Sequence, residues 1–445
     1  MPARVLLIRH SYGEIVSRLG KRHNRRWPPL SLLICASWLE KEGLTVTVID
    51  REIETFSDEA IFKLAETHDL IFLSSSDVDR WQCPNLDYDS FIRFASGFKN
   101  KGNLYLTGAH GTFYPEPFLK MTGAKGVIRE EPEWTVKEIA CGRPLDEITG
   151  LTYREDDRIH ANPDRPPGSL DLLPAPAFHK TDLKQYYYEL MGDRFTILEG
   201  SRGCSFKCTF CSLTMYGKGV RAKSSEKLIG EILAAKEAGA RNIYFIDLEF
   251  TINKKLARDT CDFLIKNPMG LRWACQTRTD LVDEPLLQQM KRAGCVLIHY
   301  GVESGSQRIL DSVDKRLKLE KIEEGFSLTR KAGIETTAFF MAGLPGETAE
   351  EREQTLAFAK KLNPTYASFH VANPYPSTKL GERFDTGEIF PEFCGRSEDD
   401  KNELKRFARR AFLAYYLRLG YILNHVAAGN PALWRRQARL FLSYL

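Results

Sequence analysis

The stretch that decides the fold is residues 195–213, FTILEGSRGCSFKCTFCSL. It begins with a short apolar run, typical of a buried strand, and continues into a loop that carries Cys204, Cys208 and Cys211. Thiolates at this C-x3-C-x2-C spacing can converge on one metal centre, and ligation by thiolates alone favours an iron–sulfur cluster or zinc. A structural zinc site needs a fourth ligand and a second cysteine pair, which the sequence lacks. The pattern therefore favours a [4Fe–4S] cluster with one open iron.

Strand and helix patterns alternate from this stretch toward the C-terminus. Helical patterns separate the strands, as at residues 225–238 and 350–361. The strand patterns cover residues 196–198, 242–246, 272–275, 296–300, 336–340 and 366–370. They predict a partial (β/α)6 barrel over residues 193–385, with functional side chains at the carboxyl ends of the strands. Residues 386–445 are predicted to form a short α-helical region.

A second alternation of strands and helices occupies residues 1–145. The strand patterns are residues 4–9, 45–50, 69–74, 103–106 and 126–129, and the helical patterns are residues 30–41, 58–67 and 89–99. This order predicts an α/β, doubly wound, Rossmann-like domain with parallel strands, whose ligand lies beyond the carboxyl ends of the strands. The loops at those ends are residues 9–13, 74–79 and 107–114. Residues 146–192 are rich in turn signals and are interpreted as a connector.

Composition bounds the class of protein. The chain has 445 residues, of which 43% are hydrophobic and 27% charged, and its formal net charge is +4. Charges of both signs are interleaved, so we expect no nucleic-acid partner. No apolar run of roughly 18 residues and no signal peptide is present, which predicts a cytoplasmic protein with reduced thiols. Seven scattered cysteines are interpreted as buried packing residues, namely Cys35, Cys83, Cys141, Cys261, Cys275, Cys295 and Cys394.

The cysteine loop and the segments after it resemble the radical SAM superfamily, over roughly residues 195–380. The resemblance implies that the open iron chelates the amino and carboxylate groups of S-adenosyl-L-methionine (SAM). Reduction then cleaves SAM to methionine and a 5′-deoxyadenosyl radical, which implies an electron donor such as flavodoxin or ferredoxin. Phe210 occupies the aromatic position that lies against the adenine, and Arg221, Lys223 and Ser224 resemble the stretch that follows the cluster loop.

The resemblance also assigns SAM contacts at the predicted strand ends. These candidates are Asp247 and Glu249 near the amino group, Gln276 and Arg278 near the carboxylate, Glu303 near the ribose, and Gly343 with Gly346 in the loop that packs the adenine. Glycine permits such close backbone approach, and a guanidinium can bind a carboxylate through two hydrogen bonds. The alternative interpretations are solvated carboxylates at a turn and, for the arginine, a surface ion pair.

A doubly wound domain placed before such a core resembles the cobalamin-binding radical SAM enzymes. Residues 27–33 (WPPLSLL), 43–50 (GLTVTVID) and 170–178 (LDLLPAPAF) match that subgroup. The implied cobalamin faces SAM between the two domains. Its candidate contacts are Ser74, Ser75, Ser76, Gly108, His110 and Thr112. His110 is interpreted as a loop contact, because no D-x-H-x-x-G segment supplies a cobalt ligand. The sequence departs from the subgroup at Thr107–Ala109 and at the REEPE turn of residues 129–133.

The implied reaction is transfer of a methyl group from methylcobalamin to an unactivated carbon, after which a second SAM remethylates the cobalt. Cyclisation, ring contraction or oxidation with the same cofactors is the alternative, and an iron–sulfur sensor that holds SAM without turnover is the non-enzymatic one. The substrate is expected to be a small molecule or lipid-like. Tyr216, Tyr300 and Tyr375 could line its cavity or pack in the core. The C-terminal helices, with Arg435, Arg436 and Arg439, could cap the barrel, bind a partner or touch a membrane surface.

Overall fold

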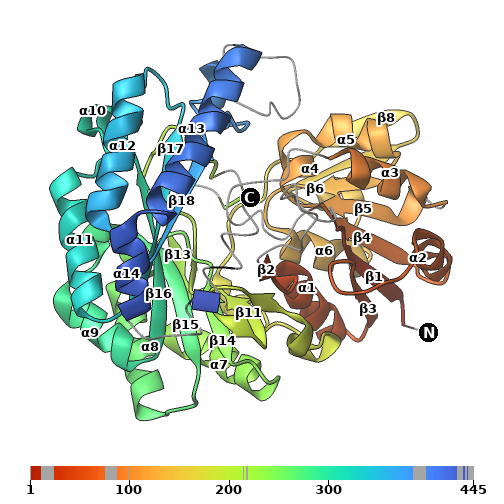
Figure 1. Cartoon of the computed structure of the whole chain (residues 1–445). Coiled ribbons are helices and arrows are strands. Elements are labelled where there is room, and N and C mark those ends of the chain that lie inside the picture. Colours follow the sequence, from red (N-terminus) through yellow and green to blue (C-terminus); the bar gives the residue numbers. More distant parts are fainter. Residues whose placement is uncertain are drawn as a thin grey trace. The chain divides into compact units, whose positions relative to one another are not determined.

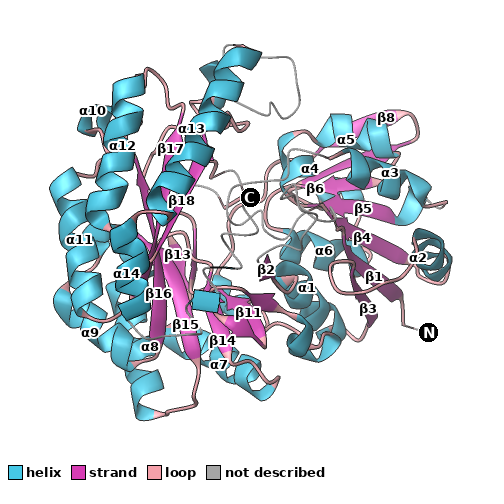
Figure 2. Cartoon of the chain, in the orientation of Figure 1, coloured by secondary structure: helices cyan, strands magenta, loops and turns pink. Residues whose placement is uncertain are grey.

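The computed structural model describes residues 2–11, 25–75, 88–99, 101–213, 215–216, 219–383, 397–427, 434–435 and 438. Contacts divide the chain into two compact units. The first unit comprises Met1–Tyr188, Gly192–Leu198 and Leu213–Arg241, and the second comprises Glu189–Met191, Glu199–Ser212 and Asn242–Leu445. Helices and strands alternate along most of both units (Figures 1 and 2). This division places residues 213–241 with the first unit, whereas the sequence assigns them to the second domain.

A seven-stranded sheet forms the centre of the first unit, in the order β3-β1-β4-β5-β6-β7-β8. Its parallel strands are β1 (Arg4–Arg9), β3 (Thr45–Asp50), β4 (Leu70–Ser74), β5 (Leu104–Thr107) and β6 (Gly126–Ile128). All five were predicted, and the doubly wound sheet is confirmed. Arg9 pairs with Ser74 and Ser74 with Thr107, so the carboxyl ends of the central strands lie side by side.

The last two strands of this sheet correct the sequence prediction. β7 (Leu151–Glu155) and β8 (Arg158–Ala161) form an antiparallel hairpin on β6, within the stretch interpreted as a connector. The hairpin turns at two aspartates, and Asp156 has a φ of 50°, which Asp tolerates better than most residues. The flanking proline and glycine residues obscured this short strand pair.

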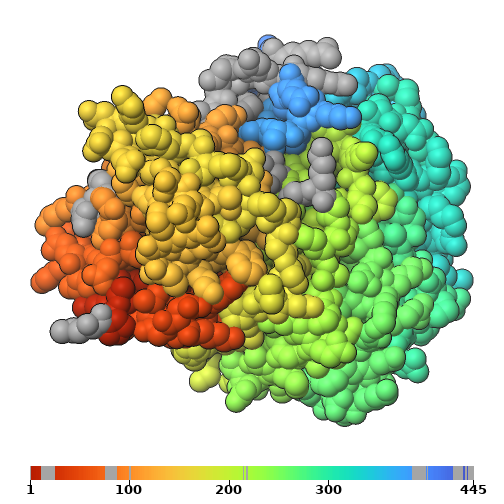
Figure 3. All heavy atoms as spheres, turned by 180° about the vertical axis from the view of Figure 1, so that it is seen from behind, coloured from red at the N-terminus to blue at the C-terminus, as the bar shows by residue number. Residues whose placement is uncertain are grey.

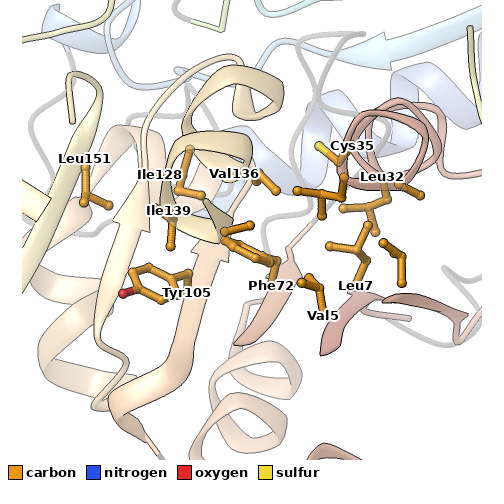
Figure 4. Packing of buried hydrophobic residues seen from close by; sticks show 14 of the residues in the cluster. Val5, Leu7, Leu32, Cys35, Phe72, Tyr105, Ile128, Val136, Ile139 and Leu151 are labelled. Atoms are coloured by element: carbon orange, nitrogen blue, oxygen red, sulfur yellow. The ribbon is translucent and has the colours of Figure 1, made fainter. Parts of the chain in front are cut away.

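Helices pack on both faces of the first sheet. The helices are α1 (Leu30–Lys41), α2 (Asp58–Ala65), α3 (Asp89–Gly97), α4 (Ala109–Phe113), α5 (Pro115–Thr122) and α6 (Pro132–Ala140). One apolar cluster joins α1 and α6 to alternate residues of the strands, such as Val5 and Leu7 of β1 (Figure 4). Because side chains alternate across a strand, Leu6 and Ile8 are buried against the opposite face. This packing fixes the strand ends that carry the candidate ligand contacts.

The connector is tied to the first sheet by a buried polar network. The guanidinium of Arg9 donates to both carboxylate oxygens of Asp50, at 2.6 and 2.5 Å. The hydroxyl of Tyr186 donates to the same carboxylate at 2.6 Å. Because all three residues are buried, these mutual hydrogen bonds replace water for each charged group.

A second sheet of six strands has the order β11-β14-β15-β16-β17-β18. The strands are β11 (Phe195–Leu198), β14 (Asn242–Phe245), β15 (Arg272–Thr277), β16 (Cys295–Glu303), β17 (Glu335–Ala342) and β18 (Tyr366–Val371). Neighbours from β14 to β18 are parallel, which confirms the predicted partial barrel. The intervening helices are α7 (Ser225–Glu237), α8 (Lys254–Lys266), α9 (Glu284–Arg292), α10 (Gln307–Ser312), α11 (Leu319–Lys331) and α12 (Ala349–Leu362). In Figure 3 this part of the chain, green to cyan, forms one continuous packed surface.

The C-terminal helices α13 (Glu398–Tyr416) and α14 (Leu419–Ala427) cover the outer edge of β18 (Figure 1). The hydroxyl of Tyr416 accepts a hydrogen bond from the backbone N–H of Ala367 at 2.8 Å and donates to the carbonyl oxygen of the same residue at 3.0 Å. Tyr421 donates to the carbonyl oxygen of Thr365 at 2.6 Å. These contacts satisfy backbone groups that an edge strand leaves open.

Other predictions for the C-terminal region stay predictions. Arg435 is exposed, whereas Arg436 and Arg439 lie outside the described residues, so their proposed partner or membrane contacts are untested. Among the described residues, no helix has the length and apolar character needed to cross a bilayer.

Substitution of Tyr416 by Phe tests the edge cover. The variant leaves the N–H and carbonyl of Ala367 without their hydroxyl partner, so we expect the free energy of unfolding to fall by about 2 kcal/mol and the amide of Ala367 to exchange faster. Urea denaturation and hydrogen exchange measure both effects. Tyr153→Phe is the matched control, because no hydrogen bond joins that buried hydroxyl to a described residue. Equal effects of the two substitutions would contradict the assigned role.

Candidate active site

The three motif cysteines share one loop between β12 (Ser201–Arg202) and β13 (Arg221–Ala222). Cys204, Cys208 and Cys211 are each half-buried, and the N–H of Cys211 donates to the carbonyl oxygen of Cys208 at 3.2 Å. Three thiols on one short turn are a donor set suited to an iron–sulfur cluster. Within the described residues, no three His, Cys, Asp or Glu side chains form a group that could hold a metal ion. Ligation of the cluster by these cysteines therefore stays a prediction.

The scattered cysteines largely behave as the sequence predicts. Cys35, Cys261, Cys275 and Cys295 are buried. Cys141 is exposed, which corrects its interpretation as a packing residue: it follows the last residue of α6, where the helix surface meets solvent. Cys83 and Cys394 lie outside the described residues.

The start of the cysteine loop is held by Asp247, which follows β14. Its two carboxylate oxygens accept hydrogen bonds from the N–H of Gly200 at 2.8 Å and from the hydroxyl of Ser201 at 2.6 Å. Asp247 is buried, so these bonds supply polar partners that water does not. The observed contacts of Asp247 position the loop, and its predicted contact with the SAM amino group stays a prediction.

Glu249 has a buried carboxylate oxygen that is free to accept a hydrogen bond. Its Oε2 has no hydrogen-bond partner among the described residues. Burial raises the pKa of Glu249 to about 7, against the opposing influence of Lys315 and Arg278. An unpartnered buried oxygen is costly unless a ligand satisfies it. The position therefore fits a bound ammonium group, as the resemblance implies for SAM. Gln276, within β15 rather than beyond it, donates to the carbonyl oxygen of Leu248 at 3.3 Å.

Arg278 lies at the end of β15 and is buried, so it is not part of a surface ion pair. Its guanidinium donates to both carboxylate oxygens of Asp280, each at 2.9 Å. It also donates to the carbonyl oxygens of Lys315 at 2.7 Å and Arg316 at 3.0 Å. The ring centroid of Phe206, in the cysteine loop, lies 3.8 Å from the guanidinium carbon. These contacts give Arg278 a role in holding the loop, and its predicted contact with the SAM carboxylate is untested.

Glu303 is the last residue of β16, where a register shift interrupts the pairing with β17. Its φ is 68°, and its Oε1 lies 2.9 Å from the ammonium nitrogen of Lys315. Both side chains are buried. Sequence reasoning missed Lys315, because it belongs to no recognisable motif and follows α10 in a polar stretch.

The predicted adenine contacts lie against one apolar cluster. Phe210 and Met341 pack on a group of buried residues made up of Ile309, Val313, Leu344, Ala372 and Leu380. Gly343 has a φ of 86°, and its N–H donates to the carboxylate of Glu347 at 2.6 Å. A Cβ at this glycine would lie 2.6 Å from Cδ1 of Leu404, so a larger residue does not fit without movement. Phe210 and Met341 therefore pack on the same apolar cluster, and their predicted contact with the adenine stays a prediction.

In the first unit, three candidate contacts surround the ends of β4 and β5. The Nδ1 of His110 lies 2.9 Å from the hydroxyl oxygen of Ser75, and the N–H of Ser75 donates to the carbonyl oxygen of Thr107 at 2.9 Å. Ser74 accepts a hydrogen bond from the N–H of His10 at 3.0 Å through its carbonyl oxygen. His110 is fully buried. Ser76 lies outside the described residues.

The predicted loop of residues 107–114 contains a short helix, α4, which is a correction. Gly108 has a φ of 105° and lets the chain turn sharply from β5 into α4. The hydroxyl of Thr112 donates to the carbonyl oxygen of Gly108 at 3.0 Å and accepts from the N–H of Glu130 at 2.9 Å. Two glycines in five residues hid the helix from the sequence.

His10, which was not predicted from the sequence as a ligand contact, is buried beside this group. Burial, together with the nearby charges of Arg51 and His110, lowers the pKa of His10 to about 3. Its Nε2 lies 3.2 Å from the hydroxyl oxygen of Ser90. The imidazole is therefore neutral at physiological pH. Its signal was the position directly after β1, at a predicted strand end.

The stretch after the cysteine loop has structural contacts in the first unit. Lys223 forms a buried ion pair with Glu231 at 2.7 Å, and Ser224 caps α7 by accepting from the N–H of Lys227. Arg221 pairs with Glu131, in the turn where the sequence departs from the subgroup.

Comparison with known proteins places these features in a wider group. The family profile of the Radical SAM superfamily matches residues 198–359. The chain is 30% identical over 435 residues to the uncharacterized methyltransferase PH0819 of Pyrococcus horikoshii, a match that covers 93% of each chain. It is 28% identical to the anaerobic magnesium-protoporphyrin IX monomethyl ester cyclase of Rubrivivax gelatinosus, over 87% of this chain and 71% of that one.

Among solved structures, the fold is similar to that of the radical S-adenosylmethionine methyltransferase TsrM from Kitasatospora setae, determined with cobalamin and a [4Fe–4S] cluster bound. The TM-score is 0.68 at 17% identity, and the match covers 86% of this chain and 74% of that chain. This similarity confirms the fold over most of the chain.

Replacement of Cys208 by Ser tests the metal centre. Loss of one of three thiolates should remove most of the iron that the anaerobically reconstituted protein binds, about four irons per chain for a [4Fe–4S] cluster. Iron analysis and the visible absorption spectrum measure the loss. Cys141→Ser, at an exposed cysteine, serves as the control and should retain its iron. Full iron content in the Cys208 variant would exclude this residue as a ligand.

Replacement of Glu249 by Gln tests its burial through the pH dependence of stability. The group ionises near pH 7 in the folded protein and near 4.5 in the unfolded chain. Between these values only the unfolded chain loses the proton, so stability falls as pH rises and the full cost persists above pH 7. The difference of about 2.5 in pKa corresponds to about 3 kcal/mol.

The apoprotein of Glu249→Gln should therefore be more stable than the wild type by up to about 3 kcal/mol at pH 8, with little difference below about pH 4, where Glu249 is mostly protonated in both the folded and the unfolded chain. Denaturation at a series of pH values measures this. A stability difference that is independent of pH would show that Glu249 has an ordinary pKa.

Proposed function

The chain belongs to the radical SAM superfamily, and on this premise we propose that it is a cobalamin-dependent radical SAM methyltransferase that methylates an unactivated carbon. The observation that carries the proposal is the combination of the three-cysteine loop with the unpartnered oxygen of Glu249. The similarity to a methyltransferase over 93% of both chains supports methyl transfer. The fold similarity to a cobalamin-bound methyltransferase supports the second cofactor.

The residues of the second unit fit a cluster and SAM. Cys204, Cys208 and Cys211 would hold the cluster, and Glu249 would accept hydrogen bonds from the SAM ammonium group. Phe210 and the loop around Gly343 would hold the adenine on the apolar cluster that they share. When bound, the reduced cluster and SAM supply a carbon-centred radical that can abstract hydrogen from an unactivated position.

The candidate residues of the first unit fit a contact surface for cobalamin rather than a cobalt ligand. His110 is fully buried, and its Nδ1 lies within hydrogen-bond distance of Ser75, which fixes the orientation of the ring. Gly108, which has no side chain, follows Thr107 at the end of β5, and its carbonyl oxygen accepts a hydrogen bond from Thr112. Cobalamin, when bound, supplies a transferable methyl group.

The chain's own side chains would bind and orient the cofactors and the substrate and would exclude water. Few of them are placed for acid–base chemistry. Tyr300 is fully buried and its hydroxyl lies 2.8 Å from that of Thr329, so it packs in the core rather than lining a cavity. Tyr216 is buried and Tyr375 half-buried. The proposal also includes a small-molecule or lipid-like substrate, a flavodoxin- or ferredoxin-type electron donor and a cytoplasmic location.

Cyclisation with the same cofactors is the second candidate function. It is favoured by the 28% identity to a cyclase over 87% of this chain. The two reactions differ in their products from SAM. Methyl transfer consumes a second SAM and yields S-adenosylhomocysteine, whereas a radical cyclisation needs only the SAM that becomes 5′-deoxyadenosine.

Anaerobic incubation of the reconstituted protein with a reductant, cobalamin and methyl-labelled SAM tests the proposal. We expect 5′-deoxyadenosine, S-adenosylhomocysteine and labelled methylcobalamin. In Cys208→Ser, 5′-deoxyadenosine should be lost, whereas S-adenosylhomocysteine and labelled methylcobalamin, the two products of cobalt methylation, should still form. Chromatography with mass detection measures all three. Formation of 5′-deoxyadenosine without S-adenosylhomocysteine would favour the cyclase. If neither product forms while the cluster and SAM are bound, the iron–sulfur sensor is the remaining interpretation.

A further inference from the structure

Lys315 is a buried cation beside the cysteine loop to which the proposed function gives no role. It is 6% exposed, and its ammonium nitrogen lies 2.9 Å from Oε1 of Glu303. Burial of an ion pair costs both ions their hydration, which the attraction between the two charges offsets only in good geometry. A pair in this place therefore calls for a functional explanation.

The backbone around Lys315 is shaped to direct this side chain inward. Asp314 and Arg316, on either side, have φ values of 52° and 51°, in the left-handed region that non-glycine residues rarely adopt. Their side chains pair with each other at 2.7 Å near the surface. The guanidinium of Arg278 holds the turn by donating to the carbonyl oxygens of Lys315 and Arg316. Two strained residues persist only where the surrounding contacts enforce them.

The same turn contacts the cysteine loop. The N–H of Thr209, directly after Cys208, donates to the carbonyl oxygen of Val313 at 3.0 Å. Arg278, which donates hydrogen bonds to this turn, also stacks on Phe206. Phe206 lies between Cys204 and Cys208 in the sequence. The position of Lys315 is therefore coupled to that of the cysteines.

The close packing around Gly301 preserves the ion pair. A Cβ there would lie 2.5 Å from Oε1 of Glu303 and 3.1 Å from the Lys315 nitrogen, so a larger residue would displace the pair.

We propose that Lys315 is a positioning residue whose buried charge raises the reduction potential of the [4Fe–4S] cluster. The proposal rests on the proposed function only in requiring a cluster at Cys204, Cys208 and Cys211. A cluster that takes one electron from an external donor gains one negative charge. A fixed cation in a site of low dielectric stabilises that charge. Net charge around a cluster is among the features that set its potential.

Anaerobic redox titration of the reconstituted full chain without SAM, followed by electron paramagnetic resonance, tests the proposal. Lys315→Met removes the charge and keeps much of the length of the side chain. We expect the equilibrium constant for reduction to fall about tenfold, which for a one-electron couple is a midpoint about 59 mV more negative. Lys315→Arg keeps the charge and should restore the midpoint. Lys318→Met, at a side chain 64% exposed three residues away, should leave it unchanged.

Glu303→Gln supplies a second test with the opposite sign, because it removes the negative end of the pair and should shift the midpoint upward. A Lys315→Met protein with full iron content and the wild-type midpoint overturns the proposal. If that variant fails to bind iron, an unshifted Glu303→Gln protein overturns it instead. Wild-type protein that holds the cluster but forms no 5′-deoxyadenosine contradicts the proposed function and leaves this titration interpretable.

Discussion

The site depends on one constraint: the described residues of the cysteine loop form no long helix or strand, so other elements must fix the position of the loop. Asp247 accepts two hydrogen bonds at the start of the loop, and the carbonyl oxygen of Val313 accepts one from Thr209 in the middle of the loop. The guanidinium of Arg278 stacks on Phe206. These anchors come from the ends of β14, α10 and β15. Functional geometry supported from several rigid elements is held more firmly than a loop could manage alone. The positions of the three thiols therefore depend on several elements in and around the second sheet.

Both units place charged groups in their interiors near strand ends, and nearly all are paired. Arg9 with Asp50, Arg202 with Glu199 and Lys315 with Glu303 are examples. Such pairs contribute little net stability, since lost hydration offsets their attraction. Their value is orientation, because a buried side chain with several hydrogen bonds has one position. Glu249, like Glu231 and Glu347, has one buried carboxylate oxygen without a hydrogen-bond partner among the described residues.

Much of the fold follows from the sequence, because apolar periodicity reports which residues are buried. The parallel strands of both sheets and helices such as α1 match the predicted ranges closely. The β7–β8 hairpin and α4 escaped prediction, since glycine, proline and short length masked their patterns. Motif spacing predicted the three cysteines as cluster ligands and Phe210 as an adenine contact, and these roles stay predictions. It could not reveal Lys315, whose relevance arises only from a tertiary contact with Glu303, nor the unpartnered oxygen of Glu249, which depends on every neighbour in space.

The tyrosines that bind the outer edge of β18 also have a consequence for biosynthesis. A growing polypeptide completes β18 well before α13 and α14 leave the ribosome, because both helices follow it in the sequence. During that interval the edge strand has no cover and can pair with another nascent chain. Chaperone assistance would matter most at this stage. A premature stop codon ahead of Tyr416 would then yield insoluble material rather than a soluble, inactive protein.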